Sequence, residues 1–202
     1  MTHDIEWEAD HWIHCFHPKS AAEHTLVCFP HAGGAAGYYH GLSAALAPDV
    51  EMLIVQYPGR ENRLFEDQAP SVEWLADTVA RVLSARGLDR PVLFGHSMGA
   101  IVAFEVTRRL NRTSALPAPL VASASAAPSH VEARADLLGT LSVESDTDLL
   151  AWITGLGGTD LGMAENEELI GLVLSALRAD LAALARYRVA PVRTARKGVA
   201  FA

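Results

Sequence analysis

The stretch "LFGHSMGA" (Leu93–Ala100) constrains the fold of this 202-residue chain more than any other feature. It places Ser97 between two glycines in the pattern G-x-S-x-G. The apolar run "PVLFG" before it predicts a buried strand, and the amphipathic stretch "AIVAFEVTRRL" after it predicts a helix. A strand that passes directly into a helix needs a very tight turn, which glycines permit. We therefore predict a sharp strand–turn–helix unit that exposes the Ser97 hydroxyl, although a plain turn is the alternative.

Further apolar runs alternate with helical patterns along the first two thirds of the chain. Apolar strands between helices are typical of an α/β fold with a mostly parallel central sheet, flanked by helices that cover both faces. A short edge strand is expected in "WIHCFHP", before Pro18. The other predicted strands are Thr25–Phe29, Glu51–Gln56, Pro91–Gly95 and Leu120–Ser123, and the predicted helices are Tyr38–Leu46, Val72–Arg86 (with Ser71 as N-cap and Gly87 as stop) and Ala100–Leu110.

The pattern changes after Pro128. Asp146–Ile153 and Glu167–Arg186 are expected to be helical, joined by the glycine-rich "GLGGTD". We interpret this region as a helical lid insertion, over approximately 133–180, within a single domain that spans 1–202. Only Gly198–Ala202 could begin another strand.

Composition excludes several classes of function. Half of the residues are hydrophobic and 20% are charged, as in an ordinary globular domain. The net charge of -8 argues against nucleic acid or an anionic membrane as partner. The N-terminus lacks the pattern of a secretory signal and no apolar run is long enough to span a membrane, so a cytoplasmic location is expected. Cys15 and Cys28 are then reduced thiols, with Cys28 in the core.

A second glycine-rich loop, "FPHAGG" (Phe29–Gly34), follows the first apolar strand. In α/β-hydrolases, one amide that holds the reaction's oxyanion follows the nucleophile and the other comes from a loop after an earlier strand. This assigns the N–H groups of Met98 and Ala32 as the two donors to the oxyanion. A simple turn is the alternative for this loop.

The series "FPHAGG…QYPGR…GHSMGA", together with "WIHCFHP" and "LSALRADLAALARYR", resembles the stand-alone type II thioesterases of polyketide and nonribosomal peptide synthesis. The resemblance covers nearly the whole chain. It implies an α/β-hydrolase fold with a helical lid. It also implies hydrolysis of acyl groups from the phosphopantetheine arm of a carrier domain, which clears stalled or wrongly loaded chains.

By this match Ser97 is the nucleophile, and Ala32 and Met98 are the oxyanion donors. The implied partners are acyl or peptidyl carrier protein domains. No metal or organic cofactor is implied, because the 4'-phosphopantetheine belongs to the partner. "YPGR" (Tyr57–Arg60) marks the family, and a structural role in its loop is expected for Arg60.

The residues that would activate Ser97 do not follow it in the usual order of acid and then histidine. Of nine histidines only His130 lies after Ser97, and the sole acid between them is Glu105. Glu105 falls two turns into a helix, so a solvated carboxylate is expected there. The family continues with another strand, a Gly-Asp loop and a Gly-Gly-His segment. We therefore expect this chain to be truncated at its C-terminus, with the last strands missing.

Other histidines are weak substitutes for the missing base. His31 and His96 should lie near Ser97, but a catalytic base needs its own orienting carboxylate, so pocket-lining or structural roles are favoured. His11, His14 and His17 are spaced by three, which could suggest a helical metal site. The segment has no supporting cluster of ligands, and an edge strand is preferred.

Three hypotheses follow. The first, which we favour, is a type II thioesterase whose sequence is incomplete; the second is a non-catalytic remnant that binds carrier proteins. The third is another serine hydrolase on the same fold, such as an esterase or acyltransferase. Under the first, this chain should hydrolyse acyl-pantetheine thioesters far more slowly than a version extended through the missing strands. A monomer is expected, although an exposed sheet edge would permit a dimer.

Overall fold

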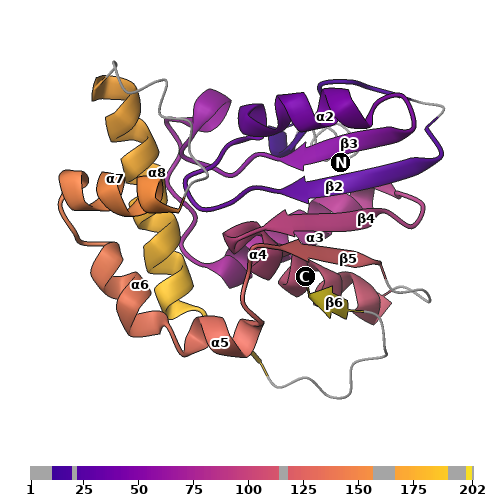
Figure 1. Cartoon of the computed structure of the whole chain (residues 1–202). Coiled ribbons are helices and arrows are strands. Elements are labelled where there is room, and N and C mark those ends of the chain that lie inside the picture. The colour runs from indigo at the N-terminus through magenta and orange to yellow at the C-terminus, as the bar shows by residue number, and fades with distance from the viewer. Residues whose placement is uncertain (1–10, 20–21, 114–117, 157–166, 191–198, 202) are drawn as a thin grey trace.

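The sheet of the computed structural model has six strands in the order β1-β3-β2-β4-β5-β6 (Figure 1). The structure describes residues 11–19, 22–113, 118–156, 167–190 and 199–201. β1 pairs antiparallel with β3, and every other pairing is parallel. The strands are β1 (Ile13–His14), β2 (His24–Phe29), β3 (Val50–Val55), β4 (Val92–His96), β5 (Leu120–Ser123) and β6 (Val199–Phe201).

The predicted strands are confirmed, with small shifts in their ends. β1 is the edge strand expected before Pro18, and β6 lies within the segment Gly198–Ala202. The two end residues of that segment fall outside the described residues. β6 adds a parallel strand beside β5, so the sheet extends on this side as the apolar run "GVAFA" indicated.

Side chains of the inner strands alternate between two apolar layers, because successive residues of a strand point to opposite faces. Val27 and Phe29 pack with helices α3 (Val72–Arg86) and α4 (Met98–Thr113), which lie behind the sheet in Figure 1. Cys28 packs on the other face, in a cluster that includes Tyr39 and, at its margin, Leu46. This double cover explains why the strands are apolar on both faces.

The helices on the sheet begin and end largely where the sequence predicts. The Ser71 hydroxyl accepts a hydrogen bond from Trp74 N–H at 3.1 Å, and Gly87 closes α3 at φ +60°. The predicted helix Tyr38–Leu46 is instead a 3₁₀ turn, η1 (Ala36–Tyr39), followed by α2 (His40–Leu46). A second 3₁₀ turn, η2 (Glu61–Arg63), lies after β3.

A layer of helices covers the ends of the strands, on the left in Figure 1, where the arrowheads of β2 and β3 point. Leu149 of α7 packs there with Leu174, Leu177 and Leu181 of α8 in a separate apolar cluster. This confirms a helical lid, although the sequence did not predict its first two helices, and 157–166 lie outside the described residues. The helices are α5 (Pro128–Glu132), α6 (Ala135–Leu141), α7 (Asp146–Gly155) and α8 (Glu167–Arg186).

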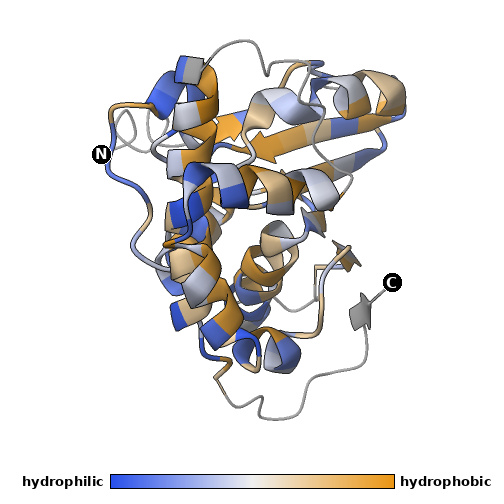
Figure 2. Cartoon of the chain, turned by 60° about the vertical axis from the view of Figure 1, so that its left-hand side comes forward, coloured by the Kyte–Doolittle hydropathy of each residue, from blue (hydrophilic) through white to orange (hydrophobic). Residues whose placement is uncertain are grey.

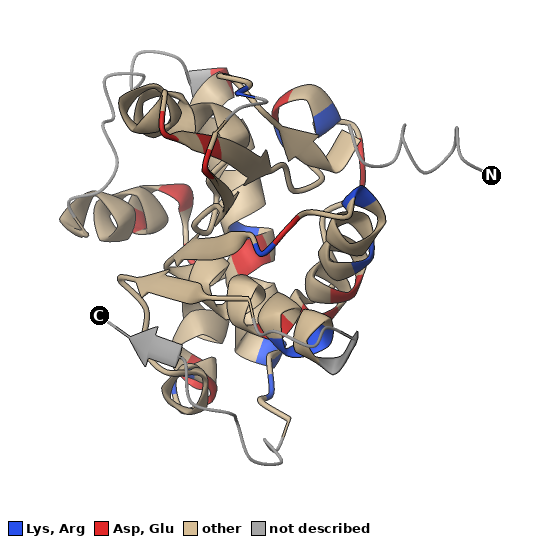
Figure 3. Ribbon diagram, turned by 90° about the vertical axis from the view of Figure 1, so that its right-hand side faces the viewer, with Lys and Arg blue, Asp and Glu red and all other residues tan. Residues whose placement is uncertain are grey.

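Figures 2 and 3 show how polarity is distributed over these layers. The strands are largely apolar, whereas the lid helices carry polar and apolar positions side by side (Figure 2). Acidic and basic residues are interspersed on helices and loops (Figure 3). Within the described ranges, no helix combines the length and the apolar character needed to cross a bilayer.

Candidate active site

Ser97 is the single residue between β4 and α4, and its backbone is strained. Its φ is +53°, a left-handed conformation that residues with a side chain rarely adopt. The turn is held on both sides: Ser97 N–H donates to Ser123 O on β5 at 2.9 Å, and Ala100 N–H donates to Ser97 O at 3.0 Å. Such strain persists only where the surrounding structure enforces it, and it clusters at functional sites. The predicted sharp turn at Ser97 is thus confirmed.

The two glycines of the motif are required by close backbone packing. A Cβ at Gly99 would lie 1.9 Å from Phe29 O, at the end of β2. A Cβ at Gly95 would lie 2.3 Å from Gly99 O, in the first turn of α4. Both neighbours are backbone atoms that cannot rotate away. The glycines therefore let α4 begin directly against the sheet, which fixes the position of Ser97.

A pocket of about 480 Å³ opens at Ser97, between the carboxyl ends of the strands and the lid. Ser97 and Met98 line it from the turn after β4, and Ala32 lines it from the loop after β2. The lid contributes mostly apolar side chains: Leu138, Trp152, Ile153, Leu177, Leu181 and Leu184. The structure thus brings all three predicted site residues to one pocket whose other walls suit an acyl chain.

The predicted oxyanion donors fit the local geometry. Met98 is the first residue of α4, so its N–H is among those that lack an acceptor within the helix. The N-terminus of a helix also favours negative charge. Ala32 precedes Gly33, whose φ of +74° turns the loop sharply after β2. The roles of Ser97, Ala32 and Met98 in catalysis stay predictions.

His31 and His96 line the same pocket, as expected. Burial and the neighbouring His96 lower the pKa of His31 to about 4, and burial also lowers the pKa of His96. The His31 ring contacts Tyr39 Oη at 3.0 Å through Nδ1, and His96 Nδ1 lies 3.2 Å from Ser123 Oγ. Within the described residues, both rings thus hydrogen-bond to hydroxyls rather than to the carboxylate that would orient a base.

The expectation that Glu105 is solvated is wrong. Its exposure is only 5%, and its carboxylate accepts a hydrogen bond from Tyr187 Oη at 2.9 Å. It also forms ion pairs with Arg108 at 2.8 Å and Arg109 at 2.7 Å. Tyr187 follows α8 and packs onto α4, a contact between residues 82 apart that helical periodicity could not reveal. These contacts give Glu105 a structural role. The other residue considered after Ser97, His130, lies exposed on α5.

The three histidines near the N-terminus have separate surroundings. His11 Nε2 contacts Glu66 Oε1 at 2.6 Å, whereas His17 Nδ1 contacts Ser43 Oγ at 3.0 Å. His14 lies on β1, beside the ring of Phe16. In the part of the chain that the structure describes, no group of three or more His, Cys, Asp or Glu side chains could hold a metal ion.

Arg60 has the loop role that the sequence suggested, but its partner Asp180 was missed. Arg60 is buried in the loop after β3, and both nitrogens at the end of its guanidinium bond Asp180 of α8. One sequence signal could have revealed this partner. Asp180 is an acid inside the apolar stripe of α8, next to Leu181 and three residues after Leu177.

Comparison with known proteins agrees with this geometry. The family model described as "Thioesterase domain" matches residues 24–200. The chain is 39% identical over 185 residues to the probable cadicidin biosynthesis thioesterase of Streptomyces griseus, covering 92% of this chain and 50% of that protein. It is 43% identical over 178 residues to thioesterase PikA5 of Streptomyces venezuelae, covering 87% of this chain and 62% of that protein.

A solved structure gives the same result. The type II thioesterase BorB from the borrelidin biosynthetic cluster superposes with a TM-score of 0.81 at 40% identity, over 93% of this chain and 75% of that one. The chain thus spans between half and three quarters of the length of these three proteins. Its fold, its serine turn and its sequence lead to one conclusion: this chain belongs to the thioesterase family, with an α/β-hydrolase fold.

Proposed function

We propose that the protein is a serine thioesterase that removes acyl groups from the 4'-phosphopantetheine arms of acyl or peptidyl carrier domains. In this role it edits stalled or misprimed chains in polyketide or nonribosomal peptide synthesis. The observation that carries the proposal is the strained turn that presents Ser97 to a pocket with an apolar lid. The similarity to PikA5 and BorB supports the substrate class.

The proposed reaction follows from the geometry of this pocket. The Ser97 hydroxyl attacks the thioester carbonyl, and the N–H groups of Ala32 and Met98 stabilise the negative charge on its oxygen. The pantetheine leaves as a thiol with the proton that Ser97 gives up, and water then cleaves the acyl–Ser97 ester to release a carboxylic acid and restore the hydroxyl. The described residues contain no histidine–carboxylate pair suited to deprotonate Ser97, so the proposal assigns no base within them.

The test uses the whole 202-residue chain with acyl-pantetheine and acyl-carrier substrates. We expect hydrolysis that Ser97→Ala reduces at least 10²-fold, together with mass-spectrometric detection of an acyl group on Ser97. Circular dichroism should show that the Ser97→Ala variant keeps its fold.

Three outcomes would contradict the proposal. Equal hydrolysis by the wild type and Ser97→Ala would rule out Ser97 as the nucleophile. Binding of acyl-carrier without turnover would favour a non-catalytic carrier-binding protein. Faster cleavage of oxygen esters than of carrier-bound thioesters would favour an esterase or acyltransferase.

A further inference from the structure

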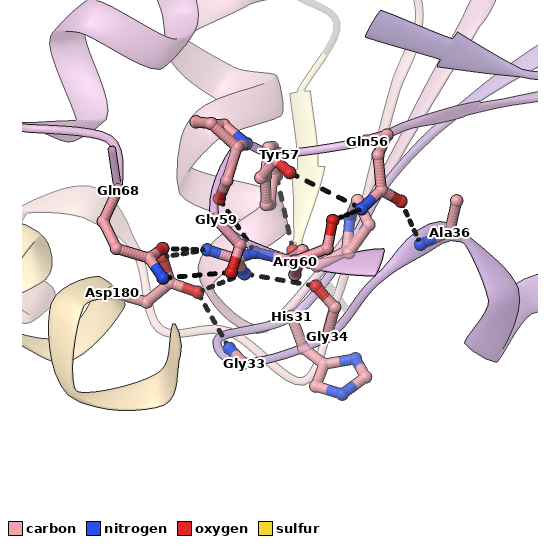
Figure 4. A network of polar contacts seen from close by, with 12 residues as sticks. His31, Gly33, Gly34, Ala36, Gln56, Tyr57, Gly59, Arg60, Gln68 and Asp180 are labelled. Atoms are coloured by element: carbon pink, nitrogen blue, oxygen red, sulfur yellow. Dashed lines mark hydrogen bonds and ion pairs between the residues drawn. The ribbon is translucent and has the colours of Figure 1, made fainter. Parts of the chain in front are cut away.

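A buried ion pair joins the lid to the sheet beside the pocket (Figure 4). Arg60 Nη1 lies 2.7 Å from Asp180 Oδ2, and Nη2 lies 3.0 Å from Oδ1, which is a bidentate arrangement. The two side chains are only 5% and 3% exposed. Arg60 comes from the loop after β3, whereas Asp180 comes from α8. The pair therefore ties two segments that lie 120 residues apart.

The same pair holds the glycine loop that carries Ala32. Gly33 N–H donates to Asp180 Oδ2 at 2.8 Å, and Arg60 Nη1 donates to Gly34 O at 3.2 Å (Figure 4). A Cβ at Gly33 would lie 3.1 Å from Leu177 Cβ, so this loop also rests directly on α8. The ion pair thus holds the Ala32–Gly33 peptide group by its N–H and the Gly34–Ala35 peptide group by its C=O.

The Arg60 end of the pair is braced from its own loop. Nε donates to Pro58 O at 3.3 Å, and Nη2 donates to Gln68 Oε1 at 3.2 Å. Gln56 Nε2 donates to Arg60 O at 3.0 Å, while Gln56 Oε1 accepts from Ala36 N–H at 2.7 Å. These bonds fix the guanidinium in one orientation. Arg60 is thus connected to the loop after β2 both directly, through Gly34 O, and through Gln56, which binds Ala36 N–H.

Stability alone does not account for such a pair. The cost of removing two charges from water largely offsets their attraction, so apolar residues of similar volume are often equally stable or better. A fixed, bidentate pair is instead well suited to set the geometry of the peptide groups that it binds.

We propose that Arg60 and Asp180 are positioning residues that hold the Ala32 amide in place for the oxyanion by fastening its loop to lid helix α8. The inference rests on the proposed function, because it assigns these residues a task in that reaction. It also couples the lid to the chemistry: if α8 moves away from the sheet, the bond to Gly33 breaks and the Ala32 amide loses its orientation.

The deciding variant is the double substitution Arg60→Met/Asp180→Leu, which removes both charges while keeping most of the buried volume. If the pair has only a structural role, the folded double variant should have the kcat of the wild type. A positioning pair predicts that kcat falls roughly 10²-fold with KM changed less than about threefold, since small misplacements of catalytic groups cost that much. Thermal unfolding and circular dichroism establish that the variant is folded.

A second readout is the amide proton of Gly33 in protein labelled with ¹⁵N-glycine. In the wild type this N–H is bonded to a carboxylate, so it should resonate downfield and exchange slowly. In the double variant it should move upfield and exchange at least tenfold faster. An unchanged Gly33 amide would overturn the proposal, as would wild-type kcat in the folded variant.

Arg60→Lys covers the case in which the double variant fails to fold, because it keeps the charge but loses the bidentate geometry. It should lower kcat about tenfold, and an unchanged kcat would overturn the proposal. The matched control is Arg178→Met/Asp146→Leu, an ion pair between α8 and α7 in which Asp146 is 69% exposed. Its kcat should stay within twofold of the wild type.

The two proposals fail in distinguishable ways. If the wild type hydrolyses no thioester and Ser97 is never acylated, the proposed function is wrong. The Gly33 amide then still shows whether Asp180 orients the loop. If wild-type hydrolysis is normal and the double variant matches it, only the positioning role is wrong.

Discussion

At the scale of single residues, burial in the pocket disfavours the charged state of His31 and His96 by lowering the pKa of each. His31 is largely buried against the rings of Tyr38 and Tyr39 and lies beside His96, at 5.9 Å between ring centroids. Water that would solvate a charged imidazole is largely displaced there, so protonation is unfavourable in the folded protein. The ring also supports the loop after β2, since a Cβ at Gly34 would lie 2.7 Å from its Cε1 atom. Charging His31 would therefore disturb the same loop that carries Ala32.

The first prediction concerns pH. The pKa of His31 is lowered from 6.5 to about 4 in the folded protein, so between these pH values the unfolded chain binds a proton that the folded chain does not. The free energy of unfolding should therefore fall as the pH drops from about 6.5 to about 4. Urea midpoints measured at pH 7.5 and 5 should show this fall, and His31→Asn should reduce it.

Two other titratable groups set the control for that experiment. His96 shifts in the same direction, so some slope should remain in His31→Asn. Hydrogen bonds from Arg63, and then His11, lower the pKa of Glu66 from 4.5 to about 2, which places its contribution at lower pH. An identical slope in wild type and His31→Asn would contradict the assigned role of His31.

At the scale of elements, the strand–turn–helix unit depends on backbone contacts that side chains would prevent. α4 begins so close to β2 that Gly99 touches the carbonyl of Phe29. This approach places the first residue of α4, Met98, at the pocket and fixes the strained Ser97. Gly171 of α8 carries no such demand, because nothing lies within 4 Å of the position that a Cβ would take.

The second prediction compares these two glycines. Gly99→Ala should lower the free energy of unfolding by about 3 kcal/mol or more, because the clash is with fixed backbone. Gly171→Ala should raise it by about 0.5–1 kcal/mol, because alanine favours an exposed helix interior. Urea denaturation of the two variants checks both values. A Gly99→Ala protein as stable as the wild type would contradict the close approach of α4 to β2.

At the scale of the whole molecule, the pocket exists only because two layers meet. The segments that follow the carboxyl ends of β2 and β4 supply Ala32, Ser97 and Met98. The helices α6, α7 and α8 supply apolar walls. Neither layer encloses a site by itself. Lid side chains such as Trp152 therefore limit the extent of the pocket, and under the proposed function they limit the length of the acyl group.

The third prediction concerns this acyl group. Trp152→Ala should enlarge the pocket and shift the preference towards longer chains, since each buried methylene is worth about 0.8 kcal/mol. Two additional methylenes should gain about tenfold in kcat/KM relative to the wild type's ratio. A series of acyl-pantetheine substrates of increasing length measures the shift. Leu137→Ala, on an exposed part of α6, is the control and should leave the preference unchanged.

The sequence by itself determined most of the elements and indicated the family. Apolar runs and glycines predicted the strands, the turn at Ser97 and the long helix Glu167–Arg186, because each pattern is a local property of consecutive residues. The glycine-rich motifs also predicted that Ala32 and Met98 lie at one site. Both line the pocket, and their catalytic roles stay predictions.

Only the tertiary structure decided how distant residues meet. The burial of Glu105 depends on Tyr187, and the role of Arg60 depends on Asp180, which lies 120 residues away. Helical periodicity predicts that a position faces another part of the protein. It does not identify the residue that packs against it. Charged side chains leave water only when a matching partner is brought to them, and folding alone supplies that partner.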